Sequence, residues 1–217
     1  GPLWYDNSTE TTEGEVVLMP RTSAGLAPAR TWEELVERIN QIGFLPLFRN
    51  EVRGFSAEEL TWGQSWWSGD PEEDPWYWRE SIARSGAVAY GKFFAGKAGF
   101  LSLEWLPVFA NWRREGYDFD ARWEDGLASH RAKKVMDCFQ LEPEWTGARL
   151  REAAGFGRGG EKNFEGTVTQ LQMQTYLVIR DFRQKVGRNG RPYGLPVSVY
   201  ATPETVWGYE RVTAAYS

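Results

Sequence analysis

The stretch NWRREGYDFD, residues 111–120, places two adjacent arginines next to several acidic residues. A carboxylate such as that of Asp118 could act as a general base, and Arg113 with Arg114 could bind a phosphate group. The same residues could instead form an ion-pair network that serves only the fold. Asp118 and Asp120 lack a third ligand at metal spacing, so we expect no metal site here.

A second chemical signal is the positive charge between residues 180 and 191, where five cations accompany one acid. Two strand-like runs flank the dipeptide Asn189-Gly190, which is typical of a β-hairpin turn. Cations on a hairpin can neutralise DNA phosphates and release counterions. They can also simply be solvated and keep the strand edges from pairing with other chains. The candidate DNA-binding residues are Arg180, Arg183, Lys185, Arg188 and Arg191.

The third signal is the aromatic and acidic run WWSGDPEEDPWYW, residues 66–78. Its rings could form a wall on which an extruded base or a small aromatic ligand stacks. The alternative is that they form a core, with the acidic residues in a loop between helices. The candidate stacking residues are Trp66, Trp67, Trp76 and Trp78.

The elements that position the basic hairpin are clearest in the last third of the chain. Apolar spacing predicts helices within residues 124–140, within 144–155 and over 162–172. Runs rich in β-branched and aromatic residues predict strands over 175–182 and 195–202. Three helices followed by a two-stranded hairpin is the order of a winged helix-turn-helix unit. The apolar face of the first helix is expected to hold Leu127, Val135, Met136 and Phe139.

The N-terminal half shows helix caps. Thr31 with Glu34, and Ser56 with Glu59, fit the capping-box pattern, and Gly43 fits the end of the first helix. Further patterns predict a helix over 75–86, a hairpin of strands 87–94 and 99–103, and a helix near Pro107.

These elements predict an α+β fold of tandem winged helix-turn-helix units, mainly helical with small antiparallel β-hairpins. We expect an irregular leader over residues 1–30, a helix-rich and winged-helix-like unit over 31–123, and a winged helix-turn-helix over 124–217.

The composition limits the classes of function. The net charge of −5 combines −9 over residues 1–129 with +4 over residues 130–217, so only the later part suits a polyanion. With one cysteine, Cys138, and one histidine, His130, we expect no disulfide, no metal and no cofactor. Neither a run of 18 apolar residues nor a signal-peptide pattern is present, which predicts a cytoplasmic protein without a membrane partner.

Four segments carry a family resemblance: LREAAGFG, FEGTVTQLQMQTYLVIRDFRQK, GRPYGLPVSVYATPETVWG and PWYWRESIARSGAVAYGKFFAGKAGFLSLEWLPVFANWRREGYDFD. They resemble the AlkZ-related proteins, relatives of the AlkZ-type winged-helix DNA glycosylases. The resemblance implies tandem winged helices that enclose DNA. The glycosylases of this kind are monofunctional and excise bulky alkylated bases, using a Gln-x-Gln or Gln-x-Asp pair to place water at the sugar.

The run QLQMQ matches that pair in its text, so the resemblance makes Gln172 and Gln174 catalytic candidates beside Asp118. Cutting an N-glycosidic bond builds positive charge on the sugar, which an amide or a carboxylate can stabilise while it holds the attacking water. In a helix, however, residues two apart point in different directions. The alternative is that these glutamines form the solvated face of the third helix.

The sequence thus favours a protein associated with double-stranded DNA and related to the alkylated-base DNA glycosylases. Base excision itself does not follow from the resemblance. The alternative is a non-catalytic winged-helix module that binds a protein partner or a small aromatic ligand, which the twelve tryptophans and the acidic N-terminal half would suit.

Overall fold

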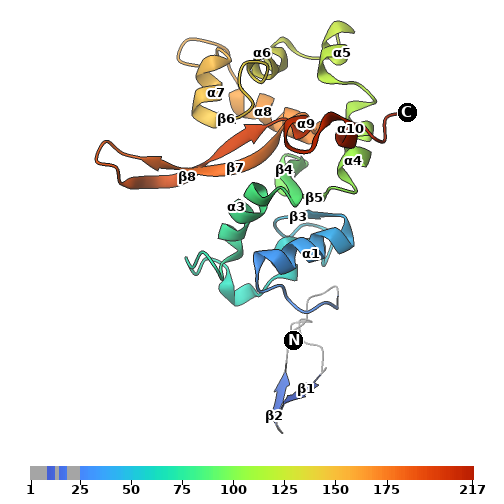
Figure 1. Ribbon diagram of the computed structural model, residues 1–217, viewed down its shortest axis with the longest axis vertical. Helices are drawn as coiled ribbons and strands as arrows, with labels where there is room; N and C mark the ends of the chain where they lie inside the picture. Colours follow the sequence, from blue (N-terminus) through green and yellow to red (C-terminus); the bar gives the residue numbers. More distant parts are fainter. Residues whose placement is uncertain (1–8, 13–14, 19–24) are drawn as a thin grey trace.

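The computed structural model describes residues 9–12, 15–18 and 25–217 (Figure 1). Within the leader, β1 (Thr9–Thr12) pairs with β2 (Glu15–Leu18) as an antiparallel hairpin, where we expected irregular structure over residues 1–30. The rest of that expectation for residues 1–24 lies outside the described residues. In the described part of the chain, none of the helices has both the length and the apolar character needed to cross a lipid bilayer.

The first half of the chain combines helices with a small antiparallel sheet. Its elements are α1 (Trp32–Ile42), β3 (Phe44–Pro46), α2 (Ala57–Leu60), the 3-10 turn η1 (Gly63–Ser65), α3 (Pro75–Ser85), β4 (Val88–Phe94) and β5 (Lys97–Ser102). β5 lies between β3 and β4. The helix predicted over residues 75–86 is confirmed by α3, and the hairpin predicted over 87–103 is confirmed by β4 and β5. The strand β3 was not expected.

Hydrogen bonds confirm the predicted helix ends in this half. Thr31 Oγ1 accepts from the backbone N–H of Glu34 at 3.2 Å, and Ser56 Oγ accepts from that of Glu59 at 3.2 Å. Gly43 ends α1 with a φ of 103°, a conformation that glycine adopts without a side-chain clash. Local capping chemistry thus determines where α1 and α2 begin and where α1 ends.

Two helices, α4 (Leu106–Arg114) and α5 (Phe119–Glu124), connect the first half to the second. The elements of the second half are α6 (His130–Cys138), β6 (Trp145–Thr146), α7 (Gly147–Ala153), α8 (Phe164–Met173), β7 (Val178–Val186), β8 (Pro192–Ala201), α9 (Pro203–Trp207) and α10 (Tyr209–Val212). β8 lies between β6 and β7 in an antiparallel sheet.

Most predicted elements of the second half are confirmed, with shifted ends. α6 begins at His130, because Ser129 Oγ accepts from the N–H of Ala132 and caps the helix there. Leu127 therefore precedes the helix and is exposed, which corrects its predicted place on the apolar face. The strand β6 and the helices α9 and α10 were not expected.

The two halves share one order of elements: helix, strand, two helices, two strands. In each half the last strand lies between the other two, so that the order β3-β5-β4 corresponds to β6-β8-β7. The described chain is therefore a mixed α+β structure with two small three-stranded sheets. The hairpins β4–β5 and β7–β8 hold equivalent positions in the two halves.

The halves are joined through α8, β4 and β7. Tyr90 on β4 lies against Phe182 on β7, with ring centroids 6.0 Å apart. Arg113 on α4 donates to the carbonyls of Phe93 and Met173, which links β4 to the end of α8. These contacts give the hairpin β7–β8 a buried base.

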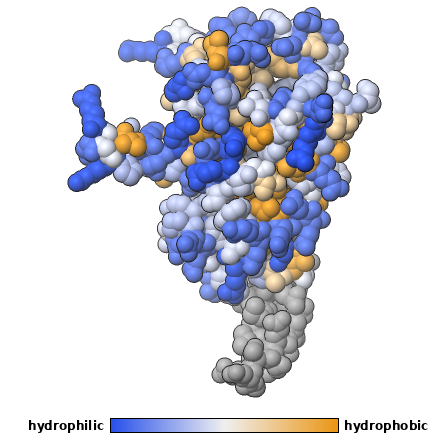
Figure 2. Space-filling view, viewed as in Figure 1, coloured by the Kyte–Doolittle hydropathy of each residue, from blue (hydrophilic) through white to orange (hydrophobic). Residues whose placement is uncertain are grey.

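Beyond this base, β7 and β8 extend away from the rest of the protein as a two-stranded projection (Figure 1). We call residues 183–195 the arm; its side chains are almost all exposed. Figure 2 shows the same projection, with hydrophilic side chains at its end. The arm is therefore accessible to a partner from several sides.

Candidate nucleic-acid interface

The tip of the arm is a tight turn whose hydrogen bonds follow from its sequence. The N–H of Gly187 donates to the carbonyl of Arg191 at 2.9 Å, and that of Gly190 donates to the carbonyl of Gly187 at 3.0 Å. Gly190 has a φ of 74°, which suits glycine, and Asn189 Oδ1 accepts from the N–H of Arg191 at 3.0 Å. These bonds hold Arg188 and Arg191 at the far end of the arm.

Three of the five predicted DNA-binding cations have no ion pair within the described part of the chain. Lys185, Arg188 and Arg191 are exposed, and no carboxylate among the described residues forms an ion pair with them. Lys185 Nζ lies 6.0 Å from the ring centroid of Tyr193, the outer limit of a cation–π contact. Their charge remains available to neutralise a polyanion.

The other two predicted cations lie nearer the body and have protein partners. Arg180 Nη1 donates to the carbonyls of Arg84 and Ala83, at 2.7 and 3.3 Å, and so satisfies the C-terminal end of α3. Arg183 Nη2 lies 3.9 Å from Glu144 Oε2 in an exposed ion pair. The five predicted cations therefore fall into two groups: Arg180 and Arg183, which have partners within the protein, and three outer cations nearer the tip of the arm.

Asp181, the single acid of the basic stretch, does not neutralise the arm. Its Oδ1 lies 2.9 Å from Arg84 Nε, and Arg84 Nη2 donates to the carbonyl of Phe182 at 3.3 Å. Arg79 lies over the ring of Phe182, 4.8 Å from its centroid. Contacts from α3 thus fix the base of the arm and hold Asp181 away from the outer cations.

Three of the four predicted stacking tryptophans lie together with Phe48. The Phe48 ring is nearly parallel to those of Trp67 and Trp76, at 25° and 17°, with centroids 6.4 and 6.3 Å away. Trp66 lies 5.7 Å from Trp67. We call these four rings the aromatic patch: Phe48 and Trp67 are exposed in it, whereas Trp66 and Trp76 are half-buried against the core. Trp78 is buried in the core instead and is not part of the patch.

The two glutamines singled out as catalytic candidates have different surroundings. Gln172 is 1% exposed; its Oε1 accepts from the N–H of Lys92 at 3.0 Å, and its Nε2 donates to the carbonyl of Val168 at 3.2 Å. Gln174 lies half-buried at the end of α8, where its backbone N–H donates to the carbonyl of Gln170. The Gln172 amide therefore has a structural role between α8 and β4.

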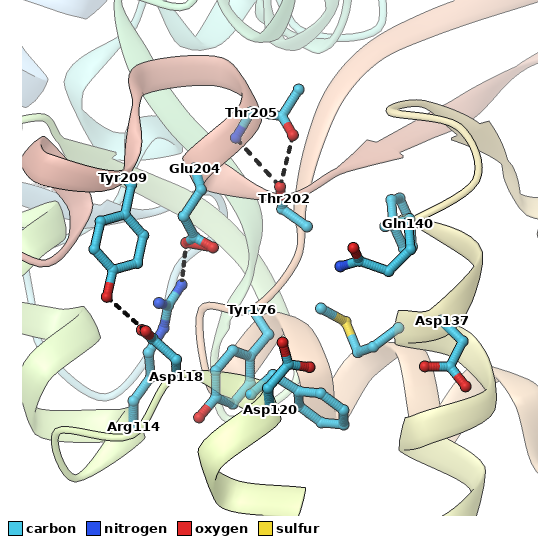
Figure 3. Close-up of a pocket in the computed structure, with 13 residues that line it drawn as sticks. Arg114, Asp118, Asp120, Asp137, Gln140, Tyr176, Thr202, Glu204, Thr205 and Tyr209 are labelled. Atoms are coloured by element: carbon cyan, nitrogen blue, oxygen red, sulfur yellow. Dashed lines mark hydrogen bonds and ion pairs between the residues drawn. The ribbon is translucent and has the colours of Figure 1, made fainter.

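Asp118 lines a cavity of about 290 Å³ between α5, α6 and α9 (Figure 3). Its Oδ2 accepts a hydrogen bond from the hydroxyl of Tyr209 at 2.6 Å, and this bond raises the pKa of that hydroxyl above its ordinary value. Asp120 and Thr202 also line the cavity. Because Thr202 directly follows β8, the cavity lies at the end of that strand opposite the arm.

The positive charge in this cavity is already compensated. Arg114 Nη2 lies 2.7 Å from Glu204 Oε1, and the guanidinium also donates to the Tyr216 hydroxyl at 3.0 Å. Burial alone would lower the pKa of Arg114, but Glu204 and Tyr216 together raise it above its ordinary value. Arg114 is therefore part of an ion pair that serves the fold, which was the alternative to phosphate binding for residues 111–120. The other carboxylates that line the cavity would repel a phosphate.

Neither the cysteine nor the histidine joins a site. His130 is exposed at the first residue of α6, and Cys138 is buried, which raises the pKa of its thiol. Over residues 9–12, 15–18 and 25–217, no group of three His, Cys, Asp or Glu side chains is placed to hold a metal ion.

Two exposed cations were missed by sequence reasoning. Arg158 and Lys162 lie on the loop between α7 and α8, and no ion pair joins either of them to a described carboxylate. Both belong to the glycine-rich run FGRGGEK, residues 156–162, which lies outside the basic stretch of residues 180–191. Phe48, the partner of the tryptophans, was also missed because it lies far from them in the sequence.

The comparisons with known proteins concern the chain as a whole. A family model described as AlkZ related matches residues 29–217, which span α1 through α10 and include the arm. Neither a curated protein nor a solved structure gave a match. Since the match covers both halves and nearly nine-tenths of the sequence, the chain belongs to the AlkZ-related family.

Proposed function

We propose that this protein binds double-stranded DNA through the arm, as a member of a family related to the AlkZ-type DNA repair proteins. One observation carries the proposal. Lys185, Arg188 and Arg191 project on a two-stranded arm without carboxylate partners among the described residues, although the chain has a net charge of −5. Such cations bind phosphates and release counterions.

The repeated order of elements supports this proposal. Each half has the order helix, strand, two helices, two strands, which contains the three helices and the following hairpin of a winged helix-turn-helix, with one short strand added after the first helix. We interpret residues 31–123 and 124–217 as two such units, and the arm as the wing of the second. The wing is the part of this motif that can follow a DNA backbone.

The helix α8 is not well placed to contact base edges in this arrangement. At its first turn the exposed Glu165 is paired with Arg151 at 3.4 Å. The exposed Arg158 and Lys162 lie on the preceding loop, so this end of the helix suits phosphates more than base edges. Its middle faces the β4–β5 turn, where a Cβ added to Gly96 would lie only 3.3 Å from Thr169 Cγ2. We therefore propose binding that depends on the phosphate backbone and tolerates different sequences.

The proposal is confined to DNA association. Gln172 is enclosed between α8 and β4, and Asp118 lies in a cavity at the opposite end of β8 from the arm. The geometry thus does not support these two residues as a joint catalytic centre beside bound DNA.

The test is duplex binding measured by fluorescence anisotropy at several salt concentrations. The variant Lys185→Gln/Arg188→Gln/Arg191→Gln should bind more weakly. Its slope of log K against log salt should fall by about 0.9 for each phosphate that the variant no longer neutralises, and so by up to about 3. The aromatic patch and the cavity play no part in this expectation.

The matched control is Arg30→Gln/Arg53→Gln/Arg211→Gln, which removes the same charge from exposed positions outside the arm and outside the equivalent β4–β5 hairpin. It should keep most of the affinity and nearly the full salt slope. The proposal fails if the unmodified protein does not bind duplex DNA at low salt, or if the arm variant and the control lose equal affinity.

A further inference from the structure

The outer part of the arm contains an irregularity that its own side chains stabilise. Arg183 pairs with Val197 and Lys185 with Tyr193, so one residue of β7, Gln184, faces three residues of β8. Gln184 Nε2 donates across the arm to the carbonyls of Tyr193 and Gly194, at 2.9 and 3.0 Å. This is a β-bulge with dedicated hydrogen bonds.

The bulge exposes a large apolar side chain. Gly194 has a φ of 65°, which suits glycine, and the next residue, Leu195, is 81% exposed. Bulges commonly redirect a side chain at a functional edge. Figure 2 shows hydrophobic side chains on the projection between its hydrophilic end and the body. Val186 and Tyr193, which also belong to the arm, are exposed as well.

This combination of cations and an exposed leucine restricts the partner. Full burial of a leucine side chain is worth about 1.5–3 kcal/mol, so a partner that covers Leu195 gains affinity. The cations at Lys185, Arg188 and Arg191 disfavour a second arm and favour a polyanion. Proteins that bind the minor groove of DNA use leucine and similar residues as wedges between base steps, beside cations on the phosphates.

We infer that the arm lies in the minor groove of duplex DNA and that Leu195 inserts between base steps and partly unstacks them. The inference rests on the proposed function. In this inference Leu195 changes the shape of the DNA, whereas the cations neutralise its charge. The bound DNA is therefore expected to be locally distorted. The cations supply attraction, and the leucine supplies deformation.

The experiment uses the full chain and a short duplex with one central 2-aminopurine, whose fluorescence rises when its stacking is lost. The unmodified protein at saturation should increase this fluorescence. Leu195→Ala should lose at least about half of the increase. It should bind about twofold to tenfold more weakly, less than full burial of a leucine would give, because the variant no longer bears the cost of unstacking the bases. Its salt slope should not change, because it removes no charge.

The matched control is Leu141→Ala, since Leu141 is 79% exposed and lies outside the arm. This variant should behave like the unmodified protein. Both leucines are exposed, so neither change should unfold the chain, and circular dichroism verifies this.

The outcomes separate the two proposals. If the unmodified protein binds with a steep salt slope but the fluorescence does not rise, the wedge is wrong and DNA binding stands. The same holds if Leu195→Ala and Leu141→Ala behave alike. If no duplex binds, both proposals fail. If Leu195→Ala instead changes the mass of the free protein in sedimentation, the leucine belongs to a contact between chains and the wedge is overturned.

Discussion

Arg114 Nη2 on α4 lies 2.7 Å from Glu204 Oε1 on α9, across 90 residues of sequence. The Arg114 side chain is 1% exposed, and it also donates to the carbonyl and the hydroxyl of Thr175, at 2.8 and 3.1 Å. One buried guanidinium therefore ties together the helix between the halves, the start of the α8–β7 connection and the end of the chain. Removing either partner should loosen the support of β7 and β8.

We expect Glu204→Gln to lower the free energy of unfolding by about 1–3 kcal/mol. The change keeps the size of the side chain but leaves the buried charge of Arg114 with only neutral partners, which is costly. The partial exposure of Glu204 keeps the loss below that of a fully buried pair. Urea unfolding measures this loss. The control is Glu210→Gln, at an exposed position of α10, whose stability should stay within about 0.5 kcal/mol of that of the unmodified protein. Equal stability of the two variants would contradict the role of the pair.

Gln172→Ala should be more destabilising than Gln174→Ala. The first change leaves the N–H of Lys92 without its acceptor between α8 and β4 and should cost about 1–3 kcal/mol. The second removes a half-buried amide at the end of α8 and should cost less than about 0.5 kcal/mol. Thermal and urea unfolding of both variants test this difference. A larger loss for Gln174→Ala would rule out the structural role assigned to Gln172.

The features that sequence predicted well are local ones. A few neighbouring residues are enough to determine the helix cap formed by Thr31 with Glu34 and the turn at Asn189-Gly190. Both predictions are confirmed. The strands β3 and β6 were missed because they are three and two residues long, too short for a periodic pattern. They become strands only because β5 and β8 supply hydrogen-bond partners from far along the chain.

The same distinction applies to the predicted interface. The sequence shows that positive charge is concentrated on the arm. It does not show which of these cations have partners within the protein and which have none among the described residues. Arg180 is engaged by α3 through the carbonyl of Arg84, 96 residues away, and no local rule could place that contact. Leu195 was missed for a related reason: a single apolar residue in a strand-like run fits a buried face until the bulge opposite Gln184 is known.

Gly99→Ala should destabilise the first sheet. Gly99 lies in β5, the central strand, and an added Cβ would lie 2.7 Å from the carbonyl oxygen of Leu45, which is backbone and cannot rotate away. The ring of Phe94 also occupies that space. Overpacking of this kind costs about 1–3 kcal/mol. Urea unfolding measures the loss, and Gly63→Ala, where the added Cβ meets open space, should not lower stability by more than about 0.5 kcal/mol. Similar losses for both would argue against crowding at Gly99.

Tyr200→Phe should weaken the dependence of stability on alkaline pH. Burial of Tyr200 in β8, with a smaller contribution from the nearby charge of Glu165, raises the pKa of its hydroxyl to about 12. An unfolded tyrosine titrates near pH 10. Between about pH 10 and 12 the unfolded chain therefore loses this proton while the folded chain keeps it. The contribution is complete below pH 10 and is lost as the pH rises toward 12.

Urea unfolding at pH 9, 10 and 11 tests this expectation. Over the upper part of that range, Tyr200→Phe should reduce the loss of stability by up to about 1.4 kcal/mol per pH unit. Some loss should remain, because burial also raises the pKa of Tyr216 to about 12. Tyr193→Phe, which removes a hydroxyl from the exposed arm, is the matched control and should keep the full slope. Tyr200→Phe and Tyr193→Phe could instead lose stability in parallel from pH 9 to 11. The Tyr200 hydroxyl would then not titrate as a buried group, which would contradict the packing of β8 against the core.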